Sequence, residues 1–421
     1  VLHLIISGNI VERETEDPLA ELSFPGMGPF ELGLKELKQA IRHAAGDDKI
    51  RGIYLEPRFF VGGFASLEEI RNELLSFRDA GKFIVAYSEF YTEQGYYLAS
   101  AADEIYLTPD YGSVEFNGLS VELTFIKRML DKIGVEPQIF RVGEFKSAVE
   151  PFIRTDMSPE NEEQISAFVN SIYHQVIGQI ADSRGMDPAR VKHISDSMLV
   201  REGSDAVELG LISGLKYGPE VMDIMHEKLS LGEEDEVTTI KFRKYNKSYS
   251  DSEYAKDRVA VIYGTGTITS GKGDEASIGS EKYVKLIRDA AENDRVKAIV
   301  LRINSGGGSA LASDVMWHEL RKASESKPVI ASLSDVAASG GYYMAMGCDT
   351  IVANRTTITG SIGIFSLLFN ARELMEDKIG ITFDQVNTGH FSDIYTLTRP
   401  LTTYEKKILQ DNVEEGYRIF T

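Results

Sequence analysis

The sequence predicts an α/β fold in which one domain occurs twice in tandem, with a helical extension attached to the first copy. Strand-like and helix-like segments alternate early in the chain, as in 52–55, 67–77, 83–86 and 96–101. This rhythm is typical of βαβ units around a mostly parallel sheet. A shift of 246 positions (339 − 93) aligns the two halves of the chain without a gap over about a hundred residues. So long a period indicates a duplicated domain and not a solenoid.

Three pairs of matching stretches show the duplication. DKIRGIYL at 48–55 matches DRVKAIVL at 294–301. GYYLA at 95–99 matches GYYMA at 341–345, and DKIGV at 131–135 matches DKIGI at 377–381. We therefore expect a first copy with its extension over 1–235, a linker over 236–257, and a second copy over 258–421.

The helical extension is expected over about 158–230. Ser158 followed by Pro159 is typical of an N-cap and first helical position. Apolar residues then recur at helical spacing from Ile165 to Ile180. The second copy ends at Thr421 without a comparable extension, so we expect it to be truncated.

Composition limits the possible functions. A chain of 421 residues can form two or three full domains. Its formal net charge of −20 argues against nucleic acid or an anionic membrane surface as a partner. A single cysteine, Cys348, excludes an internal disulfide framework, and no apolar run is long enough to span a bilayer. Because the chain opens on Val1 inside a strand-like run, we expect a targeting or anchor segment upstream.

The turn at 334–342 is the first candidate for chemistry. The strand-like run 329–333 precedes it and a helix is expected after it, which places Ser339 on the first helical turn. Free N–H groups there favour developing negative charge. Gly340 allows a substrate to approach the backbone, so its N–H could stabilise an oxyanion.

A serine nucleophile needs a base. Of the seven histidines only His390, in a Gly-His-Phe loop, is a plausible one. Lysine is the alternative, provided that desolvation lowers its pKa by roughly three units, at a cost of about 4 kcal/mol. Lys146 has apolar neighbours in Phe145 and Val149, which would favour such a shift.

Two further loops could complete a site. The glycines of 304–309 lack the ending of a nucleotide-binding P-loop, and an N–H from Gly307 or Gly308 is better suited to an oxyanion. Ser361, in the run 359–365, could hydrogen-bond a neutral lysine amine and hold it in place.

The two copies differ at the residues that matter for this chemistry. Ser339 aligns with Glu93 (339 − 246), and Lys146 aligns with Ser392 (146 + 246). Each copy has thus kept one member of a serine–lysine pair. We predict that the serine of one copy meets the lysine of the other, either within one chain or between neighbouring subunits, and that Glu93 and Ser392 mark a vestigial site.

Four stretches together resemble the signal peptide peptidase A family of the long, duplicated type: 302–309, 337–342, 359–365 and 141–151. The resemblance covers essentially the whole chain. It implies two tandem domains of the Clp-protease/crotonase-like fold, and a serine peptidase with a Ser/Lys dyad.

By motif, the resemblance assigns Ser339 as nucleophile, Lys146 as general base and Ser361 as the residue that orients the lysine. Gly340 and a glycine of 306–308, such as Gly307 or Gly308, would form the oxyanion hole. No metal or other cofactor is implied.

The family resemblance also implies partners and a location. We expect cleaved signal peptides and other short apolar peptides as substrates, a homotetramer, and a membrane anchor outside this chain. The location would be the periplasmic face of a bacterial inner membrane or an equivalent organellar membrane.

Two alternatives remain from the sequence. A crotonase-like acyl-CoA enzyme would share the fold and a glycine oxyanion hole but would leave Lys146 and the serine turn unexplained. A non-catalytic scaffold of the same fold would not be labelled at Ser339 by acylating probes.

Overall fold

The computed structural model covers the 421-residue chain and describes residues 1–14, 31–249 and 255–421. These residues form two compact units. Unit 1 comprises 1–119, 171–256 and 353–357; unit 2 comprises 120–170, 257–352 and 358–421. The units do not follow the two sequence copies, because 120–170 of the first copy folds as part of unit 2.

Unit 1 is built on a parallel sheet with the strand order β10-β1-β3-β4-β6-β9, to which β2 is added beside β1. The strands are β1 (Leu2–Val11), β2 (Glu31–Gly33), β3 (Gly52–Val61), β4 (Phe83–Ser88), β6 (Glu104–Leu107), β9 (Gly214–Leu215) and β10 (Ile240–Lys241), with β5 (Phe90–Tyr91) paired separately to β7 (Ser113–Val114). Ile53, Tyr54 and Leu55 of β3 are buried at successive positions, which lie on opposite faces of the sheet. Apolar strands buried on both faces are what a parallel sheet covered by helices requires.

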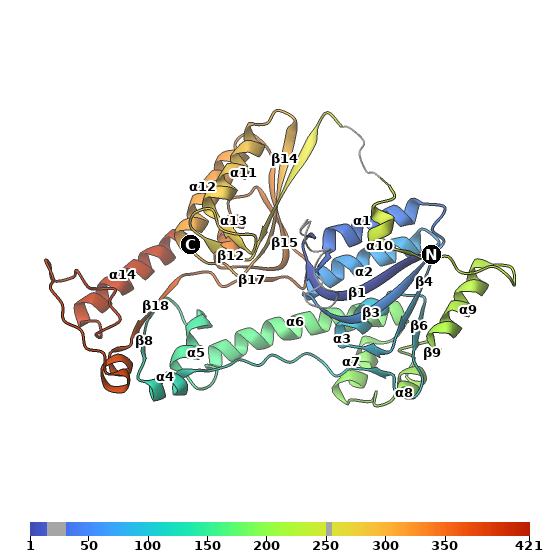
Figure 1. Ribbon diagram of the computed structural model, residues 1–421, viewed down its shortest axis with the longest axis horizontal. Helices are drawn as coiled ribbons and strands as arrows, with labels where there is room; N and C mark the ends of the chain where they lie inside the picture. The colour runs from blue at the N-terminus through green and yellow to red at the C-terminus, as the bar shows by residue number, and fades with distance from the viewer. Residues whose placement is uncertain (15–30, 250–254) are drawn as a thin grey trace. The chain divides into compact units, whose positions relative to one another are not determined.

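The helices of unit 1 cover this sheet, and Figure 1 shows α1 and α2 side by side along it. They are α1 (Leu34–Gly46), α2 (Phe64–Asp79), α3 (Glu93–Ala99), α7 (Pro188–Asp196), α8 (Gly203–Glu208), α9 (Gly218–Leu229) and α10 (Phe242–Asn246). Helix α6 (Pro159–Arg184) contributes its first turns to unit 2 and the remainder to unit 1. Ser158 Oγ accepts the N–H of Asn161 at 3.1 Å, so the expected N-cap is confirmed.

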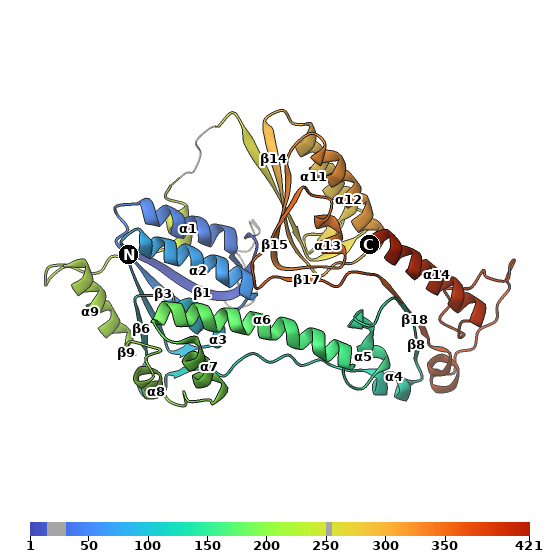
Figure 2. The same cartoon turned by 180° about the vertical axis from the view of Figure 1, so that it is seen from behind.

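Unit 2 contains the corresponding sheet of the second copy, in the order β11-β14-β15-β16, with β17 paired to β15. Its strands are β11 (Arg258–Thr265), β14 (Val296–Ser305), β15 (Val329–Ala338), β16 (Thr350–Val352) and β17 (Ile358–Gly360), beside the small pair β12 (Thr267–Thr269) and β13 (Ser277–Gly279). Helices α11 (Ser280–Glu292) and α12 (Ala310–Ser324) lie side by side in both views (Figures 1 and 2). Helix α13 (Gly340–Ala345) follows β15 directly.

A second layer of unit 2 combines elements from both copies. Strand β8 (Glu136–Arg141) pairs antiparallel with β18 (Phe365–Asn370), and the two run together in both views (Figures 1 and 2). Around them lie α4 (Lys127–Ile133), the short turns Ser147–Val149 and Leu374–Ile379, α5 (Glu150–Ile153) and α14 (Thr403–Phe420). Phe140 of β8 is buried against Leu409 and Val413 of α14. This layer joins first-copy and second-copy segments into one unit.

The predicted α/β fold with mostly parallel sheets is confirmed, and the copies show the same elements at the predicted offset. Helix α1 begins at Leu34 and α11 at Ser280 (34 + 246). The strand order β1-β3-β4-β6 matches β11-β14-β15-β16. The duplication read from the sequence therefore describes two copies of one βαβ arrangement.

Part of the segment expected to be a linker is folded. Within 236–257, β10 pairs with β1, and α10 packs on α1 with Phe242 and Tyr245 buried. The Tyr245 hydroxyl also donates to Asp47 at 2.8 Å. Burial of these two aromatic side chains is what holds the segment on unit 1.

Replacing Phe242 with alanine tests this attachment. Because the ring is only 5% exposed, Phe242→Ala should lower the free energy of unfolding by about 3 kcal/mol. Lys244→Ala, at an exposed position of the same helix, is the matched control and should change it by less than about 0.5 kcal/mol. Equal denaturation midpoints for the two variants would show that α10 does not contribute to the core.

Candidate active site

Ser339 lies between the end of β15 and the start of α13, in a strained backbone conformation. Its φ of 49° and ψ of −117° are unusual for a residue other than glycine. The Ser339 N–H donates to the carbonyl of Gly360 at 2.9 Å, and the Ser339 carbonyl accepts the N–H of Tyr343 at 2.9 Å. These two bonds hold the sharp turn, which agrees with the predicted position on the first helical turn. Such strain is common where a side chain must be presented for chemistry.

Lys146 is brought to Ser339 by the pairing of β8 with β18. The lysine follows β8 by five residues, and Ser361 precedes β18 by four. Lys146 Nζ lies 3.5 Å from Ser339 Oγ, 2.9 Å from Ser361 Oγ and 2.8 Å from the Ser361 carbonyl oxygen. The structure therefore brings together, in one chain, the three side chains that the sequence singled out.

The lysine is almost fully removed from water. Its side chain is 5% exposed, and burial lowers the pKa of Lys146 to about 8. Desolvation disfavours the charged form of an amine, so about a tenth of the Lys146 amine is neutral at about pH 7.

A buried carboxylate holds the loop that carries the lysine. Glu150 is fully buried and accepts hydrogen bonds from the Ser158 N–H at 3.1 Å, the Ser158 hydroxyl at 2.5 Å and the Asn161 side-chain amide at 3.0 Å. Arg141 lies 3.8 Å from Glu150 and donates to the Lys146 carbonyl at 3.1 Å. Sequence reasoning missed this network, although both charged residues flank Lys146 in 141–151.

The glycine loop after β14 packs directly against the serine turn. Gly307 has a φ of 100°, and a Cβ at this position would lie 2.7 Å from the Gly340 nitrogen and 2.8 Å from Ser339 Cβ. The Gly307 N–H donates to Ser305 Oγ at 3.1 Å. Among the residues that the structure describes, the N–H groups of Gly308 and Gly340 have no protein acceptor. Of the predicted oxyanion donors, the Gly307 N–H is thus already engaged within the protein.

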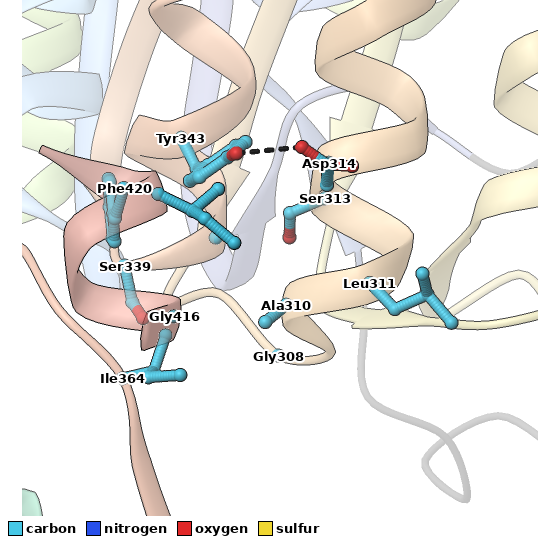
Figure 3. Close-up of a pocket in the computed structure, with 12 residues that line it drawn as sticks. Gly308, Ala310, Leu311, Ser313, Asp314, Ser339, Tyr343, Ile364, Gly416 and Phe420 are labelled. Carbon is cyan, nitrogen blue, oxygen red and sulfur yellow. Dashed lines mark hydrogen bonds between the residues drawn. The ribbon is translucent and has the colours of Figure 1, made fainter. Parts of the chain in front are cut away.

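A pocket of about 220 Å³ opens beside Ser339 (Figure 3). It is mainly apolar, with one polar pair, in which the Tyr343 hydroxyl donates to Asp314 at 2.7 Å. The residues that line it are Gly308, Ala310, Leu311, Ser313, Asp314, Ser339, Gly340, Tyr343, Ile364, Gly416, Ile419 and Phe420. Its walls come from four separate segments, so sequence reasoning could not assemble it.

The other residues that the sequence singled out do not join Ser339, Lys146 and Ser361. His390 is exposed and its ring lies beside Phe391. Glu93, at the start of α3, accepts the N–H groups of Asn117 and Gly118 at 3.1 and 2.9 Å, and burial raises the pKa of its carboxyl. The Ser392 hydroxyl donates to the carbonyl of Gly389.

The described residues contain neither a metal-binding cluster nor a helix suited to cross a membrane. Over 1–14, 31–249 and 255–421, no group of three or more His, Cys, Asp or Glu side chains could hold a metal ion. In the same part of the chain, no helix has both the length and the apolar character needed to cross a bilayer.

Comparison with known proteins decides the family. The family model described as peptidase family S49 matches residues 76–232 and 321–421. The chain belongs to this family. The first matched range includes Lys146 and the second includes Ser339. The predicted membership of a serine peptidase family is therefore confirmed.

Curated relatives match over nearly the whole chain. The chain is 35% identical to "Serine protease SPPA, chloroplastic" of Arabidopsis thaliana, covering 92% of this chain and 58% of that protein. It is 34% identical to "Protease 4" of Haemophilus influenzae, covering 96% of this chain and 67% of that protein. It is 35% identical to "Protease 4" of Salmonella typhi, covering 100% of this chain and 70% of that protein. The chain thus spans between 58% and 70% of the length of these relatives.

Gly307→Ala tests the contact between the glycine loop and the serine turn. The added Cβ would displace Gly340 and impose a strained φ, so the variant should lose about 1–3 kcal/mol of stability and at least about tenfold in peptidase rate. Gly306→Ala is the matched control, because a Cβ there meets nothing within 4 Å. Cleavage of a fluorogenic peptide would measure the peptidase rate of each variant, and denaturant unfolding would measure its stability. Indistinguishable variants would mean that the loop does not position the turn.

Proposed function

We propose that this chain is the catalytic part of a serine endopeptidase in which Ser339 is the nucleophile and Lys146 the general base. The observation that carries the proposal is the environment of the Lys146 amine. It is buried, it lies 3.5 Å from Ser339 Oγ, and its pKa is lowered to about 8. A base near its pKa at working pH is what serine activation requires.

Ser361 orients the amine. A neutral lysine amine has two N–H groups and one lone pair. With the N–H groups donated to the hydroxyl and the carbonyl oxygen of Ser361, at 2.9 and 2.8 Å, the lone pair is left for the Ser339 hydroxyl. This geometry supports the positioning role expected for Ser361.

The reaction follows from this arrangement. Lys146 takes the proton of Ser339 as Oγ attacks the peptide carbonyl, and the Gly340 and Gly308 N–H groups receive the developing oxyanion. The protonated amine then gives its proton to the leaving nitrogen as the C–N bond breaks. Water, deprotonated by Lys146 in the second half-reaction, hydrolyses the acyl-enzyme and restores Ser339.

The pocket supports apolar peptides as substrates. Its apolar walls, which include Leu311, Ile364 and Phe420, suit a medium-sized aliphatic side chain next to the cleaved bond. Remnant signal peptides are rich in such residues, and we propose them as substrates, together with other short apolar peptides. Action at a membrane through an anchor outside this chain, on the periplasmic or an equivalent organellar face, and assembly as a homotetramer belong to the same proposal.

The dyad is tested by removing each member. Ser339→Ala and Lys146→Ala should each lower the rate of peptide cleavage by at least about 10³-fold without changing the unfolding midpoint by more than a few degrees. His390→Ala is the control and should retain the wild-type rate. Substantial activity of Lys146→Ala would assign the base elsewhere, and Ser339-dependent hydrolysis of acyl-CoA in place of peptides would contradict the peptidase assignment.

The pH dependence follows from the pKa of the base. Lys146 is protonated below its pKa and neutral above it, and only the neutral amine can accept the serine proton. With the pKa lowered to about 8, kcat/KM should rise as the pH rises and level off above that value. The gain should be about tenfold between about pH 7 and about pH 9.

Lys146→Arg provides the matching variant. Guanidinium stays protonated throughout this range, so the variant should be inactive at every pH. A wild-type rate limited by a group that titrates below about pH 6 would instead indicate a carboxylate or a histidine as the base.

A further inference from the structure

The pocket beside Ser339 contains one polar pair within mainly apolar walls. Tyr343 and Asp314 face each other in it, and the Tyr343 hydroxyl donates to Asp314 Oδ1 at 2.7 Å (Figure 3). Burial and this hydrogen bond raise the pKa of Tyr343 to about 12, so the hydroxyl stays protonated at neutral pH. Over the residues that the structure describes, the other carboxylate oxygen of Asp314 accepts no hydrogen bond and joins no ion pair. The pair can therefore offer both a donor and an acceptor to a bound side chain.

The first sequence copy contains the same two groups at the equivalent positions. Asp314 aligns with Glu68 (314 − 246) and Tyr343 aligns with Tyr97 (343 − 246). Both first-copy residues belong to unit 1, where Glu68 is only 7% exposed and Tyr97 is fully buried. Each copy thus places a carboxylate and a tyrosine hydroxyl at matching positions of the fold.

In unit 1 the side chain of a glutamine is bound between these two groups. The Tyr97 hydroxyl donates to Gln179 Oε1 of α6, and Gln179 Nε2 donates to Glu68 Oε1 at 2.7 Å. The hydroxyl therefore binds the oxygen of the amide, and the carboxylate binds its nitrogen. Both ends of one primary amide are recognised, each by a group of the opposite hydrogen-bonding character.

No amide side chain belongs to the pocket of unit 2. Among the residues that line it, α14 contributes Gly416, Ile419 and Phe420, and none of the others is an asparagine or a glutamine. The Tyr343 hydroxyl is instead bonded directly to Asp314. The pair that holds a glutamine in unit 1 thus lines an open pocket next to the nucleophile in unit 2.

We propose that this pocket binds the side chain of a substrate glutamine, at the residue whose carbonyl Ser339 attacks. Asp314 accepts an amide N–H, and the Tyr343 hydroxyl turns from Asp314 to donate to the amide oxygen, as the equivalent pair does in unit 1. One hydrogen bond within the pocket is replaced by two to the substrate. The inference rests on the proposed peptidase function, and it assigns Asp314 and Tyr343 as specificity-determining residues of that reaction.

The rest of the pocket agrees with a glutamine. Its apolar walls, with Leu311, Ile364 and Phe420, suit the two methylene groups of this side chain. Methionine has a similar length but would leave the Asp314 carboxylate dehydrated and without a donor. Glutamate would place a second negative charge beside Asp314. Lysine could donate to Asp314 but has no acceptor for the Tyr343 hydroxyl.

Four fluorogenic peptides that differ only at this residue test the inference with the full-length protein. The glutamine peptide should have a kcat/KM at least about tenfold above the methionine and lysine peptides, and at least about a hundredfold above the glutamate peptide. A methionine or lysine peptide that is cleaved faster than the glutamine peptide, in a reaction that still requires Ser339, would overturn the inference and leave the proposed function standing.

Tyr343→Phe tests the donor to the amide oxygen. The variant should lower the ratio of kcat/KM for the glutamine peptide to that for the methionine peptide by at least about fivefold, because only the amide uses the hydroxyl. Leu311→Ala, on the apolar wall, is the matched control. It removes contacts common to both side chains and should leave the ratio within about twofold of the wild type. An unchanged ratio in Tyr343→Phe would refute the amide recognition.

Asp314→Asn provides a gain of activity, which a misfolded protein could not show. Without the carboxylate charge, kcat/KM for the glutamate peptide should rise at least about tenfold over the wild type. Failure of this gain would show that Asp314 does not meet the substrate side chain. Wild-type protein without Ser339-dependent cleavage of any of the four peptides would contradict the proposed function and, with it, this inference.

Discussion

The burial of the Lys146 amine is the constraint on which the rest of the site depends. An exposed lysine stays protonated at neutral pH and cannot accept a proton from serine. Lowering its pKa from 10.5 to about 8 corresponds to roughly 3 kcal/mol against the charged form. The fold supplies this energy through the pairing of β8 with β18 and through the buried Glu150, which fixes the lysine loop. Neither feature touches the reacting atoms, yet without them the amine would return to water and recover its proton.

The two copies differ at the positions of Ser339 and Lys146. In the second copy the turn after β15 kept Ser339 in a strained conformation, whereas at the equivalent position of the first copy Glu93 holds the N–H groups of Asn117 and Gly118. The lysine survived in the first copy, and its counterpart Ser392 closes a local turn. Glu93 and Ser392 thus both bind backbone groups. The glycine loop packs so closely on this strained turn that a Cβ at Gly307 would lie 2.8 Å from Ser339 Cβ.

Local patterns predicted most of the fold, and long-range packing determined what they missed. The alternation of strands and helices, the N-cap at Ser158 and the duplication all depend on residues close in sequence or repeated at one offset. The placement of Lys146 beside Ser339 followed from comparing what each copy had lost. By contrast, the burial of Phe242, the anchoring by Glu150 and the pocket beside Ser339 each require segments that meet only in three dimensions. The sequence does not distinguish the Gly307 N–H, which donates to Ser305 Oγ, from the Gly308 N–H as an oxyanion donor.

The pairing of β8 with β18 determines where Lys146 lies relative to the serine turn. Within the chain this pairing delivers the loop with Lys146 to Ser339, because the lysine follows β8 by five residues. Strand β8 comes from the first sequence copy and β18 from the second, so the two copies must fold together within unit 2 before Lys146 can lie beside Ser339.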